Sequence, residues 1–212
     1  MDQEKVWDGV AEEWARCRTR CVDEAKEFLD GKKGKVLDLG CGSGRNFLAP
    51  KGVPPAQMAS ADADKVGKDL KFYGVDFSED MLKIAKDVGY VELKKGTTDA
   101  IPYGDESFDF VIFIRVLHCV EGEEKRRKSL EEVYRVLKKG GEAVISTIGR
   151  GNQRVKNKPK ESLLPWTVDG KKFERYNYVY DKDEFEKDLE DVGFEVVSLE
   201  EGKNIVGVVR KN

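Results

Sequence analysis

The chain has 212 residues, of which 39% are hydrophobic and 37% are charged, and its formal net charge is −3 at pH 7. This balance favours one water-soluble domain over residues 1–212 and excludes a disordered chain. The slightly acidic balance also excludes a protein that coats nucleic acid indiscriminately, although it leaves room for a local basic face.

The sequence has no apolar run long enough to cross a bilayer and no basic-then-apolar leader, so we expect no membrane partner and a cytoplasmic protein. Its four cysteines lack the spacing of a zinc knuckle or a disulfide framework, so we expect reduced thiols and no metal. They are Cys17, Cys21, Cys41 and Cys119.

In chain order, helices come first, because hydrophobic residues recur at three- to four-residue spacing within residues 1–30. Residues 35–39 then form an apolar strand that breaks into a glycine-rich turn. A second strand over residues 72–76 leads into a helix that Ser78 is suited to cap. That helix is expected to run to about Val88. Later strands are expected over residues 91–93, 108–114 and 142–147, and later helices over residues 128–138 and 182–192. Residues 194–199 and 204–209 would form a closing hairpin.

This alternation of strands and helices predicts a doubly wound α/β fold, with a mostly parallel sheet covered on both faces. The closing hairpin implies that one strand lies antiparallel in that sheet. Two segments are predicted to be loops, residues 49–67 and the basic residues 149–172. A further basic run, from Lys125 to Lys128, is expected to be solvated surface.

The most informative motif joins the first strand to Asn46 through three glycines, Gly40, Gly42 and Gly44. Glycines let the backbone approach a ligand at the carboxyl end of a strand. Their spacing differs from the Gly-x-Gly-x-x-Gly that seats a pyrophosphate, and Asp38 precedes the turn. A carboxylate there suits the cationic groups of S-adenosylmethionine and would repel the phosphates of a dinucleotide.

Two more acids follow strands. Asp76 ends the second strand, where it could accept both ribose hydroxyls of an adenosine or belong to the N-cap of the next helix. Asp99 follows the third strand, where it could reach an adenine amino group or be an ordinary exposed aspartate. Ile101 or Phe77 would pack on the adenine ring. Three acids at three strand ends favour an adenosyl ligand.

Together these motifs resemble those of class I S-adenosylmethionine-dependent methyltransferases. Residues 38–44 match the family's first motif, and Ser107 to Asp109 with Lys138 to Gly141 match its later motifs. The resemblance implies a doubly wound, seven-stranded, mostly parallel sheet with the last strand antiparallel, an N-terminal helical lid, and S-adenosylmethionine as cofactor. The cofactor-binding residues that it implies are Asp38, Gly40, Cys41, Gly42, Gly44, Asn46, Asp76, Phe77, Met81, Asp99, Ala100, Ile101 and Arg115.

A narrower resemblance lies in the second half, where residues 115–118, 163–166 and 175–178 are similar to motifs of the wobble-uridine tRNA methyltransferases. That group esterifies 5-carboxymethyluridine and includes the methyltransferase domain of the AlkB-type fusion. Cys119 and Asn204–Ile205 depart from its pattern, which bears on the shape of the substrate pocket. The resemblance implies tRNA as a partner, a small zinc-binding activator protein at the edge strand 91–93, and otherwise a monomer.

Esterification of a carboxylate needs no general base, because the acceptor is already ionised at neutral pH. Orientation is then the main task. Arg115 and Arg175 are candidates to hold the carboxylate or a nearby phosphate, although each could be a surface arginine. His118, the only histidine, would position the acceptor or act as a base.

The remaining candidates contact the base and the phosphates. Tyr176, with Tyr178, would stack on a flipped base or pack against the following helix. The basic residues 149–172 would contact phosphates or be a solvated linker. Trp7 and the rest of the leading helix would cover the cofactor or pack on the sheet. Alternatives to tRNA methylation are O- or C-methylation of a small molecule, and a non-catalytic cofactor-binding regulatory subunit.

Overall fold

The computed structural model describes residues 2–47 and 70–212, so the predicted loop over residues 49–67 lies outside the described part of the chain. The predicted leading helices are two, α1 (Gln3–Cys17) and α2 (Asp23–Leu29). The Asp2 side chain caps α1 by accepting a hydrogen bond from the backbone N–H of Glu4. No helix in these two described ranges is long and apolar enough to span a membrane.

The central sheet has seven strands in the order β3-β2-β1-β4-β5-β9-β8. The five strands from β3 to β5 are parallel, and β9 runs antiparallel to both β5 and β8. The predicted doubly wound sheet with an antiparallel last strand is therefore confirmed. Its strands are β1 (Gly34–Leu39), β2 (Leu70–Asp76), β3 (Glu92–Lys95), β4 (Phe108–Ile114), β5 (Leu137–Ile148), β8 (Phe194–Glu201) and β9 (Asn204–Lys211).

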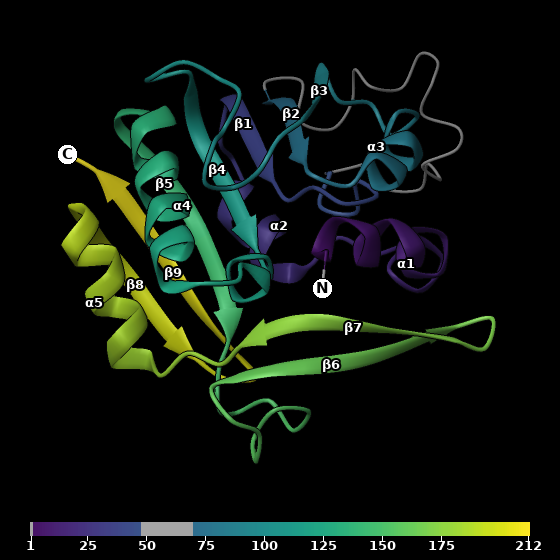
Figure 1. Cartoon of the computed structure of the whole chain (residues 1–212). Coiled ribbons are helices and arrows are strands. Elements are labelled where there is room, and N and C mark those ends of the chain that lie inside the picture. Colours follow the sequence, from purple (N-terminus) through teal and green to yellow (C-terminus); the bar gives the residue numbers. More distant parts are fainter. Residues whose placement is uncertain (1, 48–69) are drawn as a thin grey trace.

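Helices cover both faces of this sheet, as Figure 1 shows. Helix α2 packs against β1, β2 and β4 on one face, while α4 (Glu123–Val136) and α5 (Lys182–Val192) pack on the other. Successive side chains of a strand point to opposite faces of the sheet, so each central strand contributes residues to the hydrophobic cores on both faces. Helix α4 begins earlier than predicted, and α3 (Glu79–Ala85) ends short of Val88.

The prediction that residues 149–172 form a loop is wrong beyond residue 160. Strands β6 (Glu161–Val168) and β7 (Lys171–Tyr178) pair as an antiparallel hairpin outside the main sheet. Its two-residue turn, Asp169–Gly170, has positive φ at both positions, which the right-handed twist of a hairpin favours. In Figure 1 the hairpin extends from the sheet across to α1.

Candidate active site

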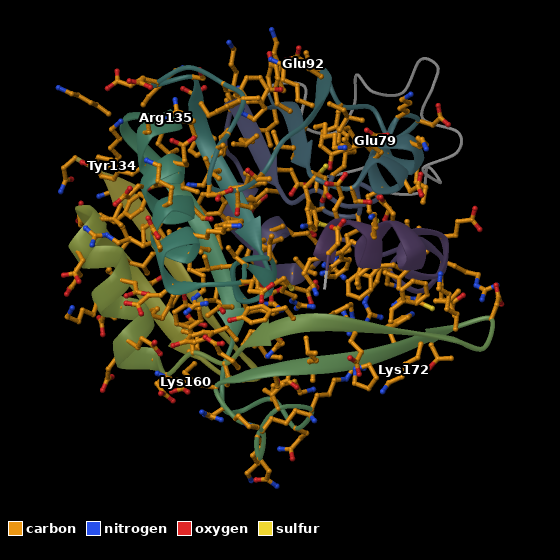
Figure 2. All side chains as sticks on the ribbon, viewed as in Figure 1. Glu79, Glu92, Tyr134, Arg135, Lys160 and Lys172 are labelled. Atoms are coloured by element: carbon orange, nitrogen blue, oxygen red, sulfur yellow. The ribbon has the colours of Figure 1, made fainter. Side chains whose placement is uncertain are left out.

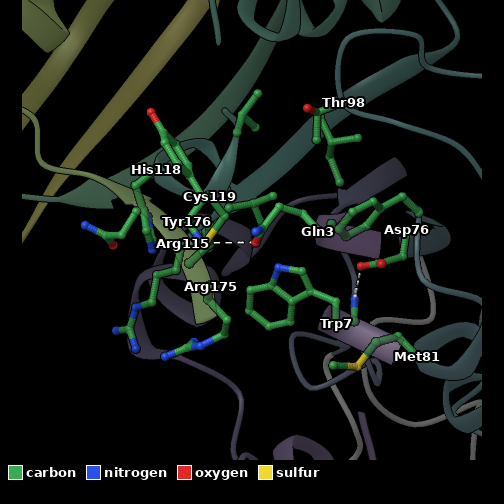
Figure 3. A pocket seen from close by; sticks show the side chains of 18 of the residues that line it. Gln3, Trp7, Asp76, Met81, Thr98, Arg115, His118, Cys119, Arg175 and Tyr176 are labelled. Atoms are coloured by element: carbon green, nitrogen blue, oxygen red, sulfur yellow. Dashed lines mark hydrogen bonds between the residues drawn. The ribbon is translucent and has the colours of Figure 1, made fainter. Parts of the chain in front are cut away.

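A cavity of about 820 Å³ opens at the carboxyl ends of β1, β2 and β4, where ligands of open α/β sheets bind. Helix α1 and the β6–β7 hairpin supply its other walls (Figure 3). Nine of the thirteen predicted cofactor residues line it: Gly40, Cys41, Gly42, Asn46, Asp76, Phe77, Met81, Asp99 and Arg115.

The other four predicted cofactor residues do not reach the cavity wall. Ile101 is buried in the core, where its N–H donates to Glu132, so Phe77 alone of the two expected adenine neighbours lines the cavity. Asp38 lies fully buried behind the glycine turn. Gly44 and Ala100 are likewise absent from the lining.

The glycine turn follows β1 and brings its backbone against the cavity. A Cβ on Gly40, which has φ +71°, would lie 2.5 Å from Val116, so no other residue fits without a shift. A Cβ on Gly42 would meet only the Met81 sulfur, at 3.8 Å, and would occupy the cavity side of the turn. The absence of side chains here leaves the room that a nucleoside needs.

Two buried acceptors beside this end of the cavity have no hydrogen-bond partner among residues 2–47 and 70–212. Asp38 Oδ2 accepts a 2.7 Å bond from the Tyr90 hydroxyl, but Asp38 Oδ1 and Asn46 Oδ1 have none. Burial raises the pKa of Asp38 to about 7, against the opposing effect of the Tyr90 bond. Unpaired buried acceptors are costly, and a cationic group with several N–H donors satisfies them. The α-ammonium of S-adenosylmethionine fits that description.

Asp76 is held at the end of β2 by two backbone donors. Its Oδ2 accepts from the Gly42 N–H at 2.8 Å, and its Oδ1 accepts from the Ser78 N–H at 2.9 Å. The N-cap of α3 is Ser78, whose hydroxyl accepts from the Met81 N–H. Burial raises the pKa of Asp76 to about 6, so it is largely ionised at neutral pH. Each oxygen retains a lone pair for a hydroxyl donor.

At the opposite end of the cavity the walls carry arginines. Arg115 follows β4 directly and has a φ of +60°, a sparsely populated conformation for a residue with a side chain. Its backbone N–H donates to the Ser146 carbonyl at 3.0 Å, and its guanidinium forms a 2.7 Å ion pair with Glu24. The Arg115 guanidinium therefore already has a carboxylate partner within the protein, Glu24.

Arg175, by contrast, has no acidic partner among residues 2–47 and 70–212. Its guanidinium carbon lies 5.5, 5.2 and 4.9 Å from the ring centroids of Trp7, Trp14 and Trp166. Its Nε is buried without a hydrogen-bond partner. Burial lowers the pKa of Arg175, yet a guanidinium stays charged at neutral pH. The result is a half-buried cation with unused donors facing the cavity.

His118 lies beside these arginines in the short 3₁₀ helix η2 (Leu117–Cys119). Burial, Arg175 and Arg115 together lower its pKa to about 3, so the imidazole is neutral at neutral pH. Its Nδ1 is buried without a partner. Because the His118 ring stays neutral, it can interact with a ligand through a hydrogen bond but not through a positive charge.

The two tyrosines of β7 have different surroundings. Tyr176 lines the cavity, and its hydroxyl accepts a 3.2 Å bond from Arg126. Tyr178 does not line the cavity. It packs against Tyr180, with the Arg126 guanidinium 3.7 Å above its ring. The prediction that the Lys125–Lys128 run is solvated is therefore wrong for Arg126, which is 4% exposed because it lies on the inner face of α4.

Sequence reasoning missed several cavity residues on segments far from the motifs. Gln3 of α1 hydrogen-bonds the β7 backbone, accepting from the Tyr176 N–H at 3.0 Å and donating to the Glu174 carbonyl at 3.4 Å. Arg18 lies over Trp14 and Trp166. The turn signal Asp169–Gly170 in the sequence would have revealed the hairpin that brings Trp166 to this site.

The fold and the two-ended cavity define an S-adenosylmethionine-dependent methyltransferase, an enzyme whose cofactor site lies on the first strands of the sheet. A model of the methyltransferase domain family matches residues 37–145, and the chain belongs to that family. The match runs from β1 through β5 and leaves the hairpin and the closing strands outside it.

Among curated proteins, one from Encephalitozoon cuniculi named as a methyltransferase is 26% identical over 91% of this chain and 87% of its own length. The tRNA (carboxymethyluridine(34)-5-O)-methyltransferase of Arabidopsis thaliana is 30% identical over 67% of this chain. This chain spans only 31% of the Arabidopsis protein.

Two solved structures share the fold. A Thermotoga maritima S-adenosylmethionine-dependent methyltransferase, described as a possible histamine N-methyltransferase, is 24% identical, covers 98% of this chain and 99% of its own, and has a TM-score of 0.67. A chain in the Haloferax volcanii complex of a methyltransferase with the Trm112 activator is 16% identical, covers 99% and 96%, and has a TM-score of 0.69. At these identities the likeness concerns the fold.

Proposed function

We propose that this enzyme methylates the carboxylate of 5-carboxymethyluridine at the wobble position of tRNA. The observation that carries the proposal is the Arg175 guanidinium, which lines the cavity and has no acidic partner in the part of the chain that the structure describes. A guanidinium with free donors binds a carboxylate in a bidentate way. The similarity to the Arabidopsis tRNA methyltransferase supports the same acceptor.

The proposed reaction needs no proton transfer. Bound S-adenosylmethionine would supply the methyl group of its sulfonium to a carboxylate oxygen, and the electron pair of the broken carbon–sulfur bond would stay on sulfur. Arg175 would hold the carboxylate, and Arg115, tied to Glu24, would fix the end of β4 beside it. Neutral His118 would form one hydrogen bond with the uracil, either as donor or as acceptor.

The approach of the methyl carbon to the acceptor oxygen depends on geometry that the chain imposes. Tyr176, Cys119 and His118 lie together in the cavity lining, and Trp7 lies between Arg175 and Asp76 (Figure 3). A rigid wall of this kind contributes by orientation, which is the main source of acceleration for an ionised acceptor.

Phosphates of the tRNA would bind the loop that precedes β6. Arg150, Lys160 and Lys172 of the predicted basic segment are in ion pairs with acids of this chain, and Figure 2 labels the last two. Lys171 of β7 is exposed and has no ion pair within the described ranges, and the same holds for three residues of the loop itself. They are Arg154, Lys156 and Lys158, and Arg154 also lines the cavity.

A small zinc-binding activator protein is proposed for one edge of the sheet. In the described part of the chain, strand β3 is one of the two edge strands, β8 being the other, and Val91 beside β3 is 59% exposed. An unpaired edge invites strand addition by another chain. Co-expression with the candidate activator followed by size-exclusion chromatography tests this partner, and separate elution of the two proteins would contradict it.

Transfer of labelled methyl to mildly alkali-treated tRNA tests the function, with a metabolite extract assayed in parallel and the candidate activator supplied. Label that enters tRNA and is released by alkali supports the proposal. Label only in the extract would establish the small-molecule alternative instead. Label in neither, with cofactor binding intact, would favour the regulatory subunit.

A further inference from the structure

We infer that Tyr90 is a positioning residue of the cofactor site, whose hydroxyl holds the Asp38 carboxylate in place for the cofactor's ammonium group. The inference rests on the proposed role of Asp38 in binding that group. Tyr90 lies in the segment between α3 and β3, outside every motif of the sequence, and it does not line the cavity. It acts through Asp38 rather than by touching the ligand.

The place of Tyr90 is fixed by close packing. Its ring contacts Phe47 and Phe72, with centroids 5.4 and 6.4 Å away. A Cβ on Gly44 or on Gly74 would lie 3.2 Å from the ring, tighter than ordinary contact. The ring therefore occupies a slot between the glycine turn and β2 that larger residues would narrow. Its hydroxyl consequently points to one place, the Asp38 carboxylate.

The protonation state of the Tyr90 hydroxyl makes it a hydrogen-bond donor. Burial, with the nearby Asp38 charge, raises the pKa of Tyr90 well above its ordinary value, so the phenol stays protonated and donates. It donates to Asp38 Oδ2 and leaves Oδ1 as the unpaired acceptor. Asn46 lies beside Asp38 and presents a second unpaired oxygen at the cavity wall. A ligand ammonium would complete this chain of hydrogen bonds.

The surroundings of Asp38 explain why such a donor is needed. Burial and the charge of Asp76 both raise the pKa of Asp38, while the Tyr90 hydroxyl, Arg45 and Asn46 lower it. Without the Tyr90 hydroxyl, the balance moves further toward the protonated acid, which cannot pair with a cation. The other titratable groups that face Asp38 are the thiols of Cys21 and Cys41.

Calorimetric titration of S-adenosylmethionine into the full chain tests the inference, comparing wild type with Tyr90→Phe between pH 6 and pH 9. The expected loss of affinity is about tenfold at pH 7, because one hydrogen bond to a buried carboxylate shifts its ionisation by about one pKa unit or more. The ratio of the two dissociation constants falls toward one at pH 9, where both carboxyls are ionised. The ligand's own titration cancels in that ratio.

A matched control is Tyr103→Phe, which also removes a phenol that donates to a carboxylate, Glu92, away from the cavity. It should leave cofactor affinity within about twofold at each pH. An affinity ratio for Tyr90→Phe that is constant across pH, or equal to one at pH 7, would overturn the inference. Thermal unfolding of the variant verifies that it folds.

Proton release measured in the same titrations gives a second readout. At pH 6.5 wild type should release protons on binding, because the ammonium draws Asp38 into its ionised form. Tyr90→Phe should release more, since its Asp38 begins more protonated. Equal release by both proteins would contradict the inference. No acceptor is present in these titrations, so failure of the tRNA proposal leaves their outcome unaffected.

Discussion

The two ends of the cavity are built from different parts of the chain. The cofactor end consists of backbone turns and buried acids at the ends of β1 and β2, all within the parallel sheet. The acceptor end consists of arginines and tryptophans contributed by α1, β4 and the β6–β7 hairpin. The first end is suited to one cationic nucleoside, whereas the second is suited to an anion. A methyl group would cross from one to the other.

Because different segments build the two ends, variants at each end should affect different steps, either cofactor binding or methyl transfer. Substitutions at the cofactor end should weaken S-adenosylmethionine binding with or without an acceptor. Substitutions at the acceptor end should leave that binding intact and impair transfer alone.

Asp76→Ala should weaken S-adenosylmethionine binding by about 100-fold, because charge-assisted bonds to two ribose hydroxyls and the anchor for the Gly42 N–H are lost together. Calorimetry measures the affinity. Asp80→Ala removes an exposed carboxylate on α3, in an ion pair with Lys83, and serves as the control. A loss below about threefold for Asp76→Ala would remove the ribose assignment.

Arg175→Met should lower kcat/KM for the acceptor by about 30-fold, the loss expected when a charged hydrogen bond to a carboxylate is removed. Its S-adenosylmethionine affinity should stay within about twofold of wild type. The control, Arg210→Met, removes a surface guanidinium that pairs with Glu142 far from the cavity. If Arg175→Met lowered cofactor affinity as much as it lowered transfer, the assignment of Arg175 to the acceptor end would be contradicted.

The triple variant Arg154→Ser, Lys156→Ser, Lys158→Ser should bind tRNA about tenfold more weakly at low salt. Up to three phosphate contacts are lost, so the slope of log affinity against log salt should fall by about 2 to 3. A triple variant of exposed lysines elsewhere, Lys83, Lys86 and Lys187, controls for net charge. An unchanged slope in the loop variant would argue for a small acceptor.

Transfer at saturating cofactor should vary by less than about twofold between pH 6 and 8, since the acceptor carboxylate is ionised throughout. His118 also stays neutral over that range, because its pKa is lowered to about 3. Initial rates across this pH range check the prediction. A tenfold rise per pH unit would instead indicate an acceptor that must first lose a proton.

Most of the fold followed from the sequence because its signals are local. The glycine turn, the acid that ends β2 and the helix over Lys182–Val192 are each contained within a short run of residues. The closing hairpin was likewise apparent from its apolar strands. These elements position the cofactor end, where eight of the thirteen predicted residues line the cavity; the ninth, Arg115, lines it at the opposite end.

The acceptor end was harder to predict because its contacts join distant segments. Gln3 meets β7 across more than 170 residues, and no periodicity in the sequence indicates that bond. Arg126 looked like one more surface cation because its tyrosine partners come 50 residues later. The hairpin was missed for a different reason, since its basic composition masked the Asp169–Gly170 turn.

The central claim is that the methyl group forms an ester on a carboxylate held at the arginine end of the cavity. Nucleoside analysis by mass spectrometry of alkali-treated tRNA, incubated with enzyme, activator and labelled S-adenosylmethionine, tests it most directly. We expect label in the methyl ester of 5-carboxymethyluridine, strongly reduced for Arg175→Met. Label on a ring atom, on ribose, or on a metabolite alone would contradict it.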